Sequence, residues 1–261
     1  MSPTRETVLV VISHYNARPA DELVRLLDQA RAVPAGWPFR VRIVVNLGRP
    51  RCLILPERHG GTEILYRGNT GYNIGAWDHG WRTGPGSRGY LFLQEECRLV
   101  REDWVGAFAR RATEPGVGLV GECLSPSWDA TWGELARRFR EETLPDHQLG
   151  GRPADRVSCY LDFLAREGID PGPKGDHLQS LVLFARREAL EAIDGFPVGR
   201  DYGEAIAAEI GISKKVQALG LDLCEVGPEP FFYVEHPQWL HRRSATMTVS
   251  AVSTDGASLF L

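Results

Sequence analysis

The sequence predicts an α/β fold in which a mostly parallel central sheet is flanked by helices within a single domain. The first reason is that short, largely aliphatic and β-branched runs occur, such as 8–12 and 41–45. Such runs are typical of parallel strands that are buried on both faces. The second reason is that helical segments separate these runs, and alternating strands and helices favour a parallel, doubly wound sheet.

The first half of the chain alternates strands and helices in a regular order. A helix is expected over 20–33, where apolar residues fall on one stripe, and Pro34 and Gly36 end it. The loop 69–75 leads into a second helix, expected from about 76 to 81. The expected strands are residues 8–12, 41–45, 63–66 and 89–93.

The second half of the chain has a less regular pattern. Its expected strands are residues 118–123, 178–184 and 221–226. Its expected helices are residues 104–112, 131–142, 160–167, 186–193 and 204–219. Periodicity is weak beyond 242, so we expect one domain over 1–242 and a tail over 243–261.

Composition excludes several classes of function. The formal net charge of -4 argues against general attraction to nucleic acid or anionic lipid. The five cysteines form no CxxC pair, which argues against a disulfide framework or a zinc knuckle. The polar N-terminus and the lack of an apolar run of about 20 residues indicate no signal peptide and no transmembrane segment. We therefore expect a cytoplasmic protein, with contact at a membrane surface left open.

Polar residues follow the strands of the first half at the point where each strand ends. They lie near Asn16, Asn46, Asn69 and Gln94. Ligands of open α/β sheets bind outside the carboxyl ends of the strands, so these segments should line one crevice. The fourth strand runs directly into Glu95 and Glu96.

Adjacent carboxylates at a strand end repel each other unless something compensates their charge. A divalent cation is one compensation, because hard cations take oxygen ligands. Neutralisation by Arg98 and simple solvation are the alternatives, and the strand end alone does not separate these three interpretations.

Six motifs occur in order between about residues 8 and 240. They are 10–16 (VVISHYN), 44–48 (VVNLG), 69–76 (NTGYNIGA), 94–96 (QEE), 186–196 with its GF end, and the helix from 208 to Gly220. Together they resemble the glycosyltransferases of the GT-A fold, in particular the large family 2 of inverting enzymes.

The resemblance implies a nucleotide-sugar site in the half formed by about 1–123 and an acceptor site in about 124–242. The donor would be a UDP-, GDP- or dTDP-linked sugar, and the acceptor a glycan or a small molecule. The residues that the resemblance places at the donor are Tyr15, Asn16, Asn46, Asn69, Gly71, Gly75, Gln94 and Glu95.

The resemblance also implies a divalent cation, Mg²⁺ or Mn²⁺, that neutralises the departing diphosphate. Glu96 stands at the position of the usual direct ligand, and His236 would complete the site, with His241 as the alternative. Gln94 stands where the family carries a first aspartate. Glutamine offers no charge, so we expect weaker metal binding than with two aspartates.

An inverting transferase needs a base that takes the proton of the acceptor hydroxyl. Glu209 occupies the place of the family's catalytic carboxylate, judged by its spacing to Gly220. Glu204 and Asp201 are rivals nearby. The ordinary interpretation of Glu209 is a helix carboxylate that pairs with residue 214 or 215.

The sequence therefore predicts a glycosyltransferase, and the loop 73–77 is a weak indication of cell-surface polysaccharide assembly. The replacements at Asn46, Gln94 and Glu209 motivate an alternative, a non-catalytic nucleotide-sugar or glycan-binding module on the same fold. A nucleotidyltransferase would want a glycine-rich, basic loop directly after the first strand, and 13–16 (SHYN) does not supply one.

Overall fold

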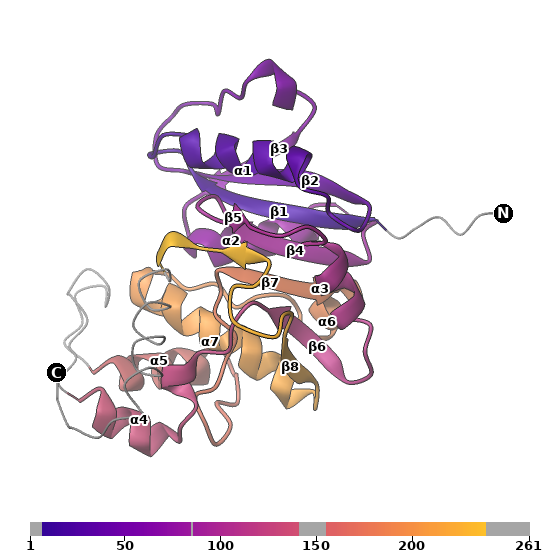
Figure 1. The fold of residues 1–261 in the computed structure, drawn as a ribbon. Helices are drawn as coiled ribbons and strands as arrows, with labels where there is room; N and C mark the ends of the chain where they lie inside the picture. Colours follow the sequence, from indigo (N-terminus) through magenta and orange to yellow (C-terminus); the bar gives the residue numbers. More distant parts are fainter. Residues whose placement is uncertain (1–6, 85, 141–154, 239–261) are drawn as a thin grey trace, which may run out of the picture.

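A buried strand, β1 (Val8–Tyr15), organises the first half of the sheet in the computed structural model (Figure 1). It pairs in parallel with β2 (Phe39–Leu47) on one side and with β4 (Gly89–Gln94) on the other. The structure describes residues 7–84, 86–140 and 155–238. The tail expected over 243–261 and His241 lie outside these ranges.

The main sheet has the strand order β3-β2-β1-β4-β7-β6-β8. Its remaining strands are β3 (Glu63–Gly68), β6 (Val117–Gly121), β7 (Val182–Arg186) and β8 (Asp222–Glu225). The β2–β3 and β6–β8 pairs are parallel, whereas β7 runs antiparallel to both β4 and β6. The mostly parallel sheet in a single α/β domain is thus confirmed.

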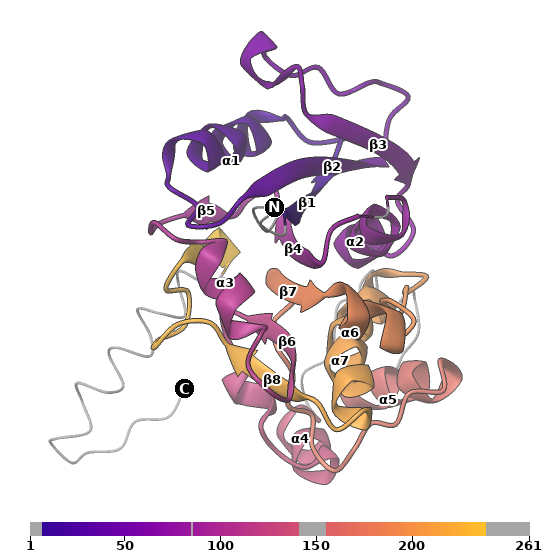
Figure 2. The same cartoon turned by 90° about the vertical axis from the view of Figure 1, so that its right-hand side faces the viewer.

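Helices cover both faces of this sheet, as Figure 2 shows. Helices α1 and α3 lie on one face, and α2, α6 and α7 lie on the other. The helices are α1 (Asp21–Ala32), α2 (Tyr72–Arg82), α3 (Gly106–Arg111), α4 (Trp132–Arg138), α5 (Arg156–Arg166), α6 (Arg187–Ala192) and α7 (Tyr202–Ala218). Two short 3-10 turns are η1 (Glu57–His59) and η2 (Pro126–Trp128).

Each face of the sheet has its own apolar core. Side chains of a strand alternate between the two faces, so β1 contributes to both cores. Val10 packs in the core that contains Phe108 of α3, and Val11 packs in the core that contains Trp77 of α2. Burial on both faces explains why β1 and β4 read as nearly continuous apolar runs.

Strand β1 continues into the segment that the sequence predicted as a polar loop. Ser13, His14 and Tyr15 remain paired with β2. Nδ1 of the His14 ring and the backbone N–H of Tyr15 both bond to the carboxylate of Glu95 inside the protein. A buried strand end can therefore carry polar residues without leaving them unpaired.

Helix ends differ from the expected ones where a side chain caps the helix. Helix α5 begins at Arg156 rather than at 160, since the carboxylate of Asp155 accepts the backbone N–H of Ser158 at 2.9 Å. Helix α4 begins after Thr131, which forms a capping box with Glu134. Residues 141 and 142, expected at the end of that helix, lie outside the described ranges.

A second, two-stranded sheet joins β5 (Arg98–Leu99) to β9 (Val234–Glu235) in antiparallel pairing. The carboxylate of Glu122 accepts the backbone N–H groups of residues 232–234 at 2.8, 3.2 and 2.7 Å. These bonds fix the chain just before His236. A residue far along the sequence is thereby brought next to the end of β4.

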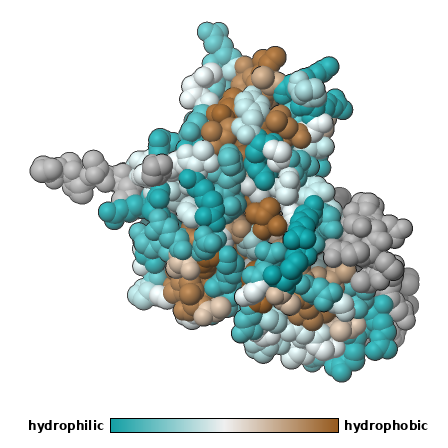
Figure 3. Space-filling view, turned by 180° about the vertical axis from the view of Figure 1, so that it is seen from behind, coloured by the Kyte–Doolittle hydropathy of each residue, from teal (hydrophilic) through white to brown (hydrophobic). Residues whose placement is uncertain are grey.

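Apolar side chains appear as separate areas on the face seen in Figure 3, among larger hydrophilic areas. Ile54, in the connection between β2 and β3, exposes 86% of its surface.

Among the described helices, none combines the length and the apolar character needed to cross a bilayer.

Replacing Trp77 is expected to destabilise the fold strongly. Its ring is fully buried in α2, and its indole N–H donates to the carbonyl oxygen of Leu93 at 3.1 Å. Trp77→Ala should lower the free energy of unfolding by about 3–5 kcal/mol, the usual cost of deleting a buried aromatic side chain. Urea denaturation followed by circular dichroism measures the loss.

Leu219→Ala is the matched control, because Leu219 is 48% exposed just after α7. We expect it to change the free energy of unfolding by no more than about 0.5 kcal/mol. Equal losses in the two variants would contradict the place assigned to Trp77 in the core.

Candidate functional site

The carboxyl ends of β1, β2 and β4 open onto a cavity of about 620 Å³. Helices α5 and α7 and the segment 177–181 line its other side. A doubly wound sheet binds ligands at this position, and the volume suits a small molecule. The residues predicted from the sequence that line this cavity are Tyr15, Asn46, Asn69, Gln94, Glu95, Glu96, Glu209 and His236.

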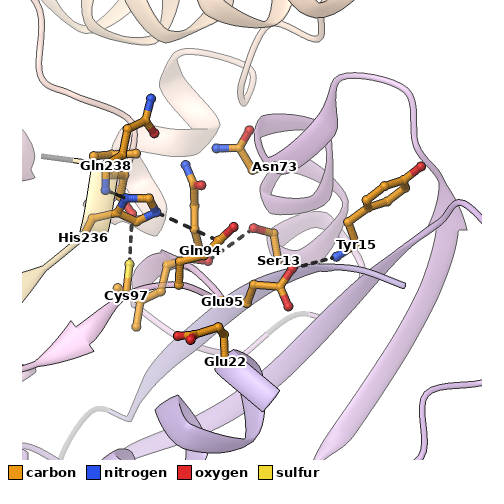
Figure 4. Close-up of polar contacts among 12 residues, drawn as sticks. Ser13, Tyr15, Glu22, Asn73, Gln94, Glu95, Cys97, His236 and Gln238 are labelled. Atoms are coloured by element: carbon orange, nitrogen blue, oxygen red, sulfur yellow. Dashed lines mark hydrogen bonds and ion pairs between the residues drawn. The ribbon is translucent and has the colours of Figure 1, made fainter. Parts of the chain in front are cut away.

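Glu95 uses its carboxylate to join the ends of β1 and β4. One oxygen contacts Nδ1 of His14. The other accepts the backbone N–H of Tyr15 at 3.2 Å, as Figure 4 shows. Glu95 and His14 are only 4% and 2% exposed, so this charge is matched within the protein. The sequence alone does not single out His14. A histidine at the end of one strand and a carboxylate at the end of the neighbouring strand could nevertheless indicate such a pair.

Gln94 bonds to the chain segment before β7. Its side-chain N–H donates to the carbonyl oxygen of Ser180 at 3.2 Å, and the Asn73 side chain approaches the same oxygen at 3.5 Å. Figure 4 shows Gln94, Asn73 and His236 pointing into the same space. Gln94 thus connects the two halves of the cavity wall.

Glu96 faces the cavity between two basic groups. One carboxylate oxygen contacts the guanidinium of Arg18, and the other lies 3.9 Å from Nε2 of His236. Burial raises the pKa of Glu96. The His236 ring, the backbone N–H of Glu96 itself and the charge of Arg18 lower this pKa by more than burial raises it. The pKa therefore lies below its usual value, and the carboxylate is ionised at neutral pH.

His236 carries a buried ring nitrogen that the surrounding protein does not satisfy. Its Nδ1 accepts the backbone N–H of Gln238 at 3.2 Å, whereas Nε2 has no hydrogen-bond partner among the described residues. The ring is 5% exposed. An unsatisfied buried nitrogen that faces a carboxylate is a feature of ligand sites.

Glu96 and His236 could supply two ligands to a divalent cation. Among the described residues, no three His, Cys, Asp or Glu side chains gather into a metal site, so phosphate and water would complete the coordination. Nε2 must be unprotonated to bind a metal, so His236 would give up the bond that its Nδ1 accepts from Gln238.

Glu209, on α7, lines the same cavity with a carboxylate that has no cationic partner within the described part of the chain. Its Oε1 accepts the backbone N–H of Ser180 at 2.7 Å. Burial raises the pKa of Glu209 to about 7, and the bonds from Ser180 offset burial only in part. The ordinary partners are engaged elsewhere, since Lys214 bonds to Asp176 at 2.9 Å and Lys215 to a backbone oxygen.

The two rivals of Glu209 have structural roles and do not line the cavity. Glu204 is 5% exposed; it pairs with Arg166 at 2.7 Å and accepts the backbone N–H of Arg200 at 2.7 Å. The carboxylate of Asp201 caps α7 by accepting the backbone N–H of Glu204 at 2.9 Å. Of these three carboxylates, only Glu209 reaches the cavity.

Two of the predicted donor-site asparagines bond mainly to the protein itself. The side-chain oxygen of Asn16 accepts the backbone N–H groups of Gly48 and Arg49 at 2.7 and 3.1 Å, and Asn16 does not line the cavity. Asn46 lines it, while its amide donates to Tyr72 and accepts from Arg67. Asn16 therefore shapes the connection after β2.

Helix α2 begins at Tyr72 rather than at about 76, so Gly71 precedes it directly and Gly75 lies in its first turn, and packing requires both glycines. Gly71 has a φ of 71°, and a Cβ there would lie 2.4 Å from the side chain of Val198. A Cβ on Gly75 would lie 2.3 Å from the backbone oxygen of Thr70. Neither glycine lines the cavity, whereas Asn69, which precedes α2, does.

Aromatic side chains and the neutral ring of His177 line the part of the cavity away from the strand ends. The rings of Trp128 and Tyr160 lie 5.5 Å apart. Burial lowers the pKa of His177 to about 4, and its Nδ1–H donates to the oxygen of Gly175 at 2.8 Å. The neutral ring therefore keeps Nε2 as a hydrogen-bond acceptor. Sequence pattern alone does not identify His177, because its role depends on burial.

The sequence matches no protein-family model and no curated protein sequence. Solved structures are similar over nearly the whole chain. A mannosyltransferase from Pyrobaculum calidifontis, in complex with GDP-Man and Mn²⁺, has a TM-score of 0.50 and 15% identity and covers 98% of this chain and 67% of its own.

Two further solved structures have the same architecture. TarS from S. aureus has a TM-score of 0.51 and 14% identity, and the match covers 97% of this chain and 40% of TarS. Glucosyl-3-phosphoglycerate synthase from Mycobacterium tuberculosis, in complex with Mn²⁺, UDP-glucose and phosphoglyceric acid, has a TM-score of 0.50 and 14% identity, covering 95% of this chain and 78% of its own. At this identity the likeness establishes the fold alone, and the fold of this chain is the GT-A fold.

Proposed function

We propose that this chain is an inverting, nucleotide-sugar-dependent glycosyltransferase of the hexosyltransferase type. The observation that carries the proposal is Glu209, a carboxylate whose pKa is raised to about 7 and which lines the same cavity as the strand ends of a GT-A sheet. A group with a pKa near neutrality is suited to take and release a proton under physiological conditions.

Glu209 would act as the general base. It takes the proton of the acceptor hydroxyl while the hydroxyl oxygen forms a bond to the anomeric carbon of the donor sugar. The bond from that carbon to the diphosphate oxygen breaks, and the nucleoside diphosphate leaves with the electron pair. Attack in line with the departing group inverts the configuration.

The half formed by about 1–123 would bind the donor, a UDP-, GDP- or dTDP-linked sugar. Tyr15, Asn46 and Asn69 line this part of the cavity, and Gln94 and Glu95 form its end at β4. Asn16, Gly71 and Gly75 would shape this pocket from behind. Position along the cavity supports the assignment of the five residues that line it.

Glu96 and His236 would hold a Mg²⁺ or Mn²⁺ ion. The orphaned Nε2 of His236 beside the Glu96 carboxylate supports this assignment. The ion would supply positive charge to the diphosphate as it departs. Ionised Glu96 and a deprotonated Nε2 are the protein's part of that site.

The half formed by about 124–242 would bind the acceptor, a glycan or a small molecule. Trp128 and Tyr160 suit the apolar face of a sugar ring. We propose a role in polysaccharide or other glycan assembly on the cytoplasmic side of the cell, on the resemblance of 73–77 to transferases of that kind.

A non-catalytic module that binds nucleotide sugars is the second candidate. Gln94 favours it, because the side chain brings no charge to the site and its amide is bonded to Ser180. A thermal-shift screen against UDP-, GDP-, CMP- and dTDP-sugars, followed by assays of donor hydrolysis and transfer, separates the two candidates. Tight binding without turnover of any donor would favour the module.

Glu209→Gln is expected to lower kcat by about 10²–10⁴-fold, the usual contribution of a general base. Affinity for the donor should change little, because the amide keeps the shape of the carboxylate. Release of nucleoside diphosphate from the donor found by the screen measures turnover. Glu191→Gln, at an exposed carboxylate on α6, is the matched control and should keep full activity. Undiminished turnover in Glu209→Gln would remove this residue as the base.

The pH dependence of kcat/KM should report the same carboxylate. A base with a pKa of about 7 is protonated and inactive at lower pH, so kcat/KM should rise about tenfold per unit below pH 7 and level off above it. Initial rates between pH 5 and 9, in buffers of constant ionic strength, measure the profile. If the rise of kcat/KM with pH kept the same midpoint in Glu209→Gln, another group would be titrating, and the prediction would be wrong.

Glu96→Gln should weaken the response to metal. In the wild-type protein, EDTA should lower turnover and Mn²⁺ should restore it. The variant should lose this restoration, and its affinity for Mn²⁺ in the presence of the nucleoside diphosphate should fall by about tenfold or more. Electron paramagnetic resonance of free Mn²⁺ measures binding without relying on activity.

Glu22→Gln is the control for this variant, because Glu22 is a carboxylate of α1 that pairs with Arg25 and does not line the cavity. It should retain both the binding of Mn²⁺ and the activation by Mn²⁺. If Glu96→Gln also retained both, the metal role of Glu96 would be lost.

A further inference from the structure

We propose that Arg18 binds the diphosphate group of the donor, and that Glu96 holds the guanidinium in position for it. The inference rests on the proposed function and extends it to a residue that neither the sequence pattern nor the resemblance assigns.

Arg18 lies in the short connection between β1 and α1. Its backbone N–H donates to the carbonyl oxygen of Tyr15 at 2.9 Å, which closes a turn directly after the strand. The side chain lines the cavity, and its guanidinium contacts the carboxylate of Glu96 beyond the end of β4. The turn therefore places a cation beside the two central strand ends.

Few permanent positive charges face this cavity. Among the described residues that line it, the lysines and arginines are Arg18 and Arg156. Arg156 begins α5, on the side of the acceptor, and its guanidinium lies 5.4 Å from the ring of Phe139. His14 is bonded to Glu95. Arg18 is thus the permanent cation on the side of the strand ends.

A diphosphate bound there would otherwise meet the negative charge of Glu96. Glu95 adds little repulsion, because His14 and the N–H of Tyr15 already bond to it. The carboxylate of Glu96 is partly open to the cavity, with a side chain that is 24% exposed. A cation must lie between this carboxylate and the phosphate oxygens.

The guanidinium can contact two anions at once. It carries five N–H donors in a planar fork, and the contact with Glu96 uses one of its terminal nitrogens. The side chain is 62% exposed, so the remaining donors are open to a ligand. Bidentate contact with phosphate is a geometry that arginine favours.

Glu96 would then serve two cations with its two oxygens. One oxygen contacts Arg18, and the other faces the orphaned Nε2 of His236, where the metal would bind. Gln94 provides no second carboxylate for a metal. The positive charge of Arg18 is part of the chain itself. It would therefore replace part of the charge that a more strongly bound metal would bring to the diphosphate.

Binding of nucleoside diphosphates in EDTA tests this assignment with the metal removed. Titration calorimetry with UDP, GDP and dTDP first identifies the diphosphate that the wild-type chain binds. Arg18→Met should weaken this binding by about tenfold, the low end expected for a charged hydrogen bond at an exposed side chain. Arg18→Lys should recover part of the loss, because it keeps the charge without the fork.

The matching nucleoside separates a phosphate contact from general damage to the site. Its affinity, measured by ligand-observed NMR, should be equal in the wild type and in Arg18→Met. Arg110→Met is the control variant, because Arg110 also pairs with a carboxylate, that of Asp103, is 55% exposed and does not line the cavity. It should bind the diphosphate like the wild type.

Equal affinity of Arg18→Met and the wild type for the diphosphate would overturn the role of Arg18 and leave the proposed function intact. An equal loss for the nucleoside and the diphosphate would also overturn it, since the effect would not be on the phosphates. A wild-type chain that binds a nucleoside diphosphate only when Mn²⁺ is added would overturn this inference and leave the proposed function intact. A wild-type chain that binds none of them, either in EDTA or with Mn²⁺, would overturn the proposed function, and this inference with it.

Discussion

The buried carboxylate of Glu95 sets the arrangement of the whole strand-end region. It closes the gap between β1 and β4 by bonding to the His14 ring and to the backbone of Tyr15. A carboxyl group at this depth is tolerated only with such partners, because burial of a polar group without hydrogen bonds is costly. With Glu95 used inside the protein, Glu96 is the acid of this pair that is left to face Arg18, His236 and a ligand.

Ser180 connects the two sides of the cavity through its backbone. Its N–H donates to Glu209, and its carbonyl oxygen accepts from Gln94. The proposed base on α7 is therefore linked through one peptide segment to the proposed donor site at the end of β4. The bond to Glu209 orients the carboxylate without neutralising it, so burial dominates and the pKa remains high.

Glu122 likewise fixes the C-terminal end of the described chain by hydrogen bonds. Its carboxylate collects three backbone N–H groups just before His236, and β9 pairs with β5 directly after the acidic strand end. Two segments more than a hundred residues apart thus meet at Glu96. The acidic strand end, the orphaned imidazole and the cation of Arg18 become one site through these contacts.

The sequence by itself determined the class of fold, and it placed polar residues at the strand ends that border the cavity. Buried parallel strands must be apolar on both faces, so 8–12 and 89–93 are visible in the sequence, and polar residues after them mark the cavity edge. It could not choose between Glu209, Glu204 and Asp201, because that choice depends on which face of α7 meets the cavity and on the partners Arg166 and Arg200.

Only the tertiary structure decided the direction of β7, the pairing of Glu95 with His14 and the position of Arg18 beside Glu96. Periodicity reports how a segment is buried, which is a local property of the chain. Ion pairs, hydrogen bonds and raised pKa values depend on the distance between groups that are far apart in sequence and on their shared exclusion from water. Those quantities exist only once the strands and helices have packed together.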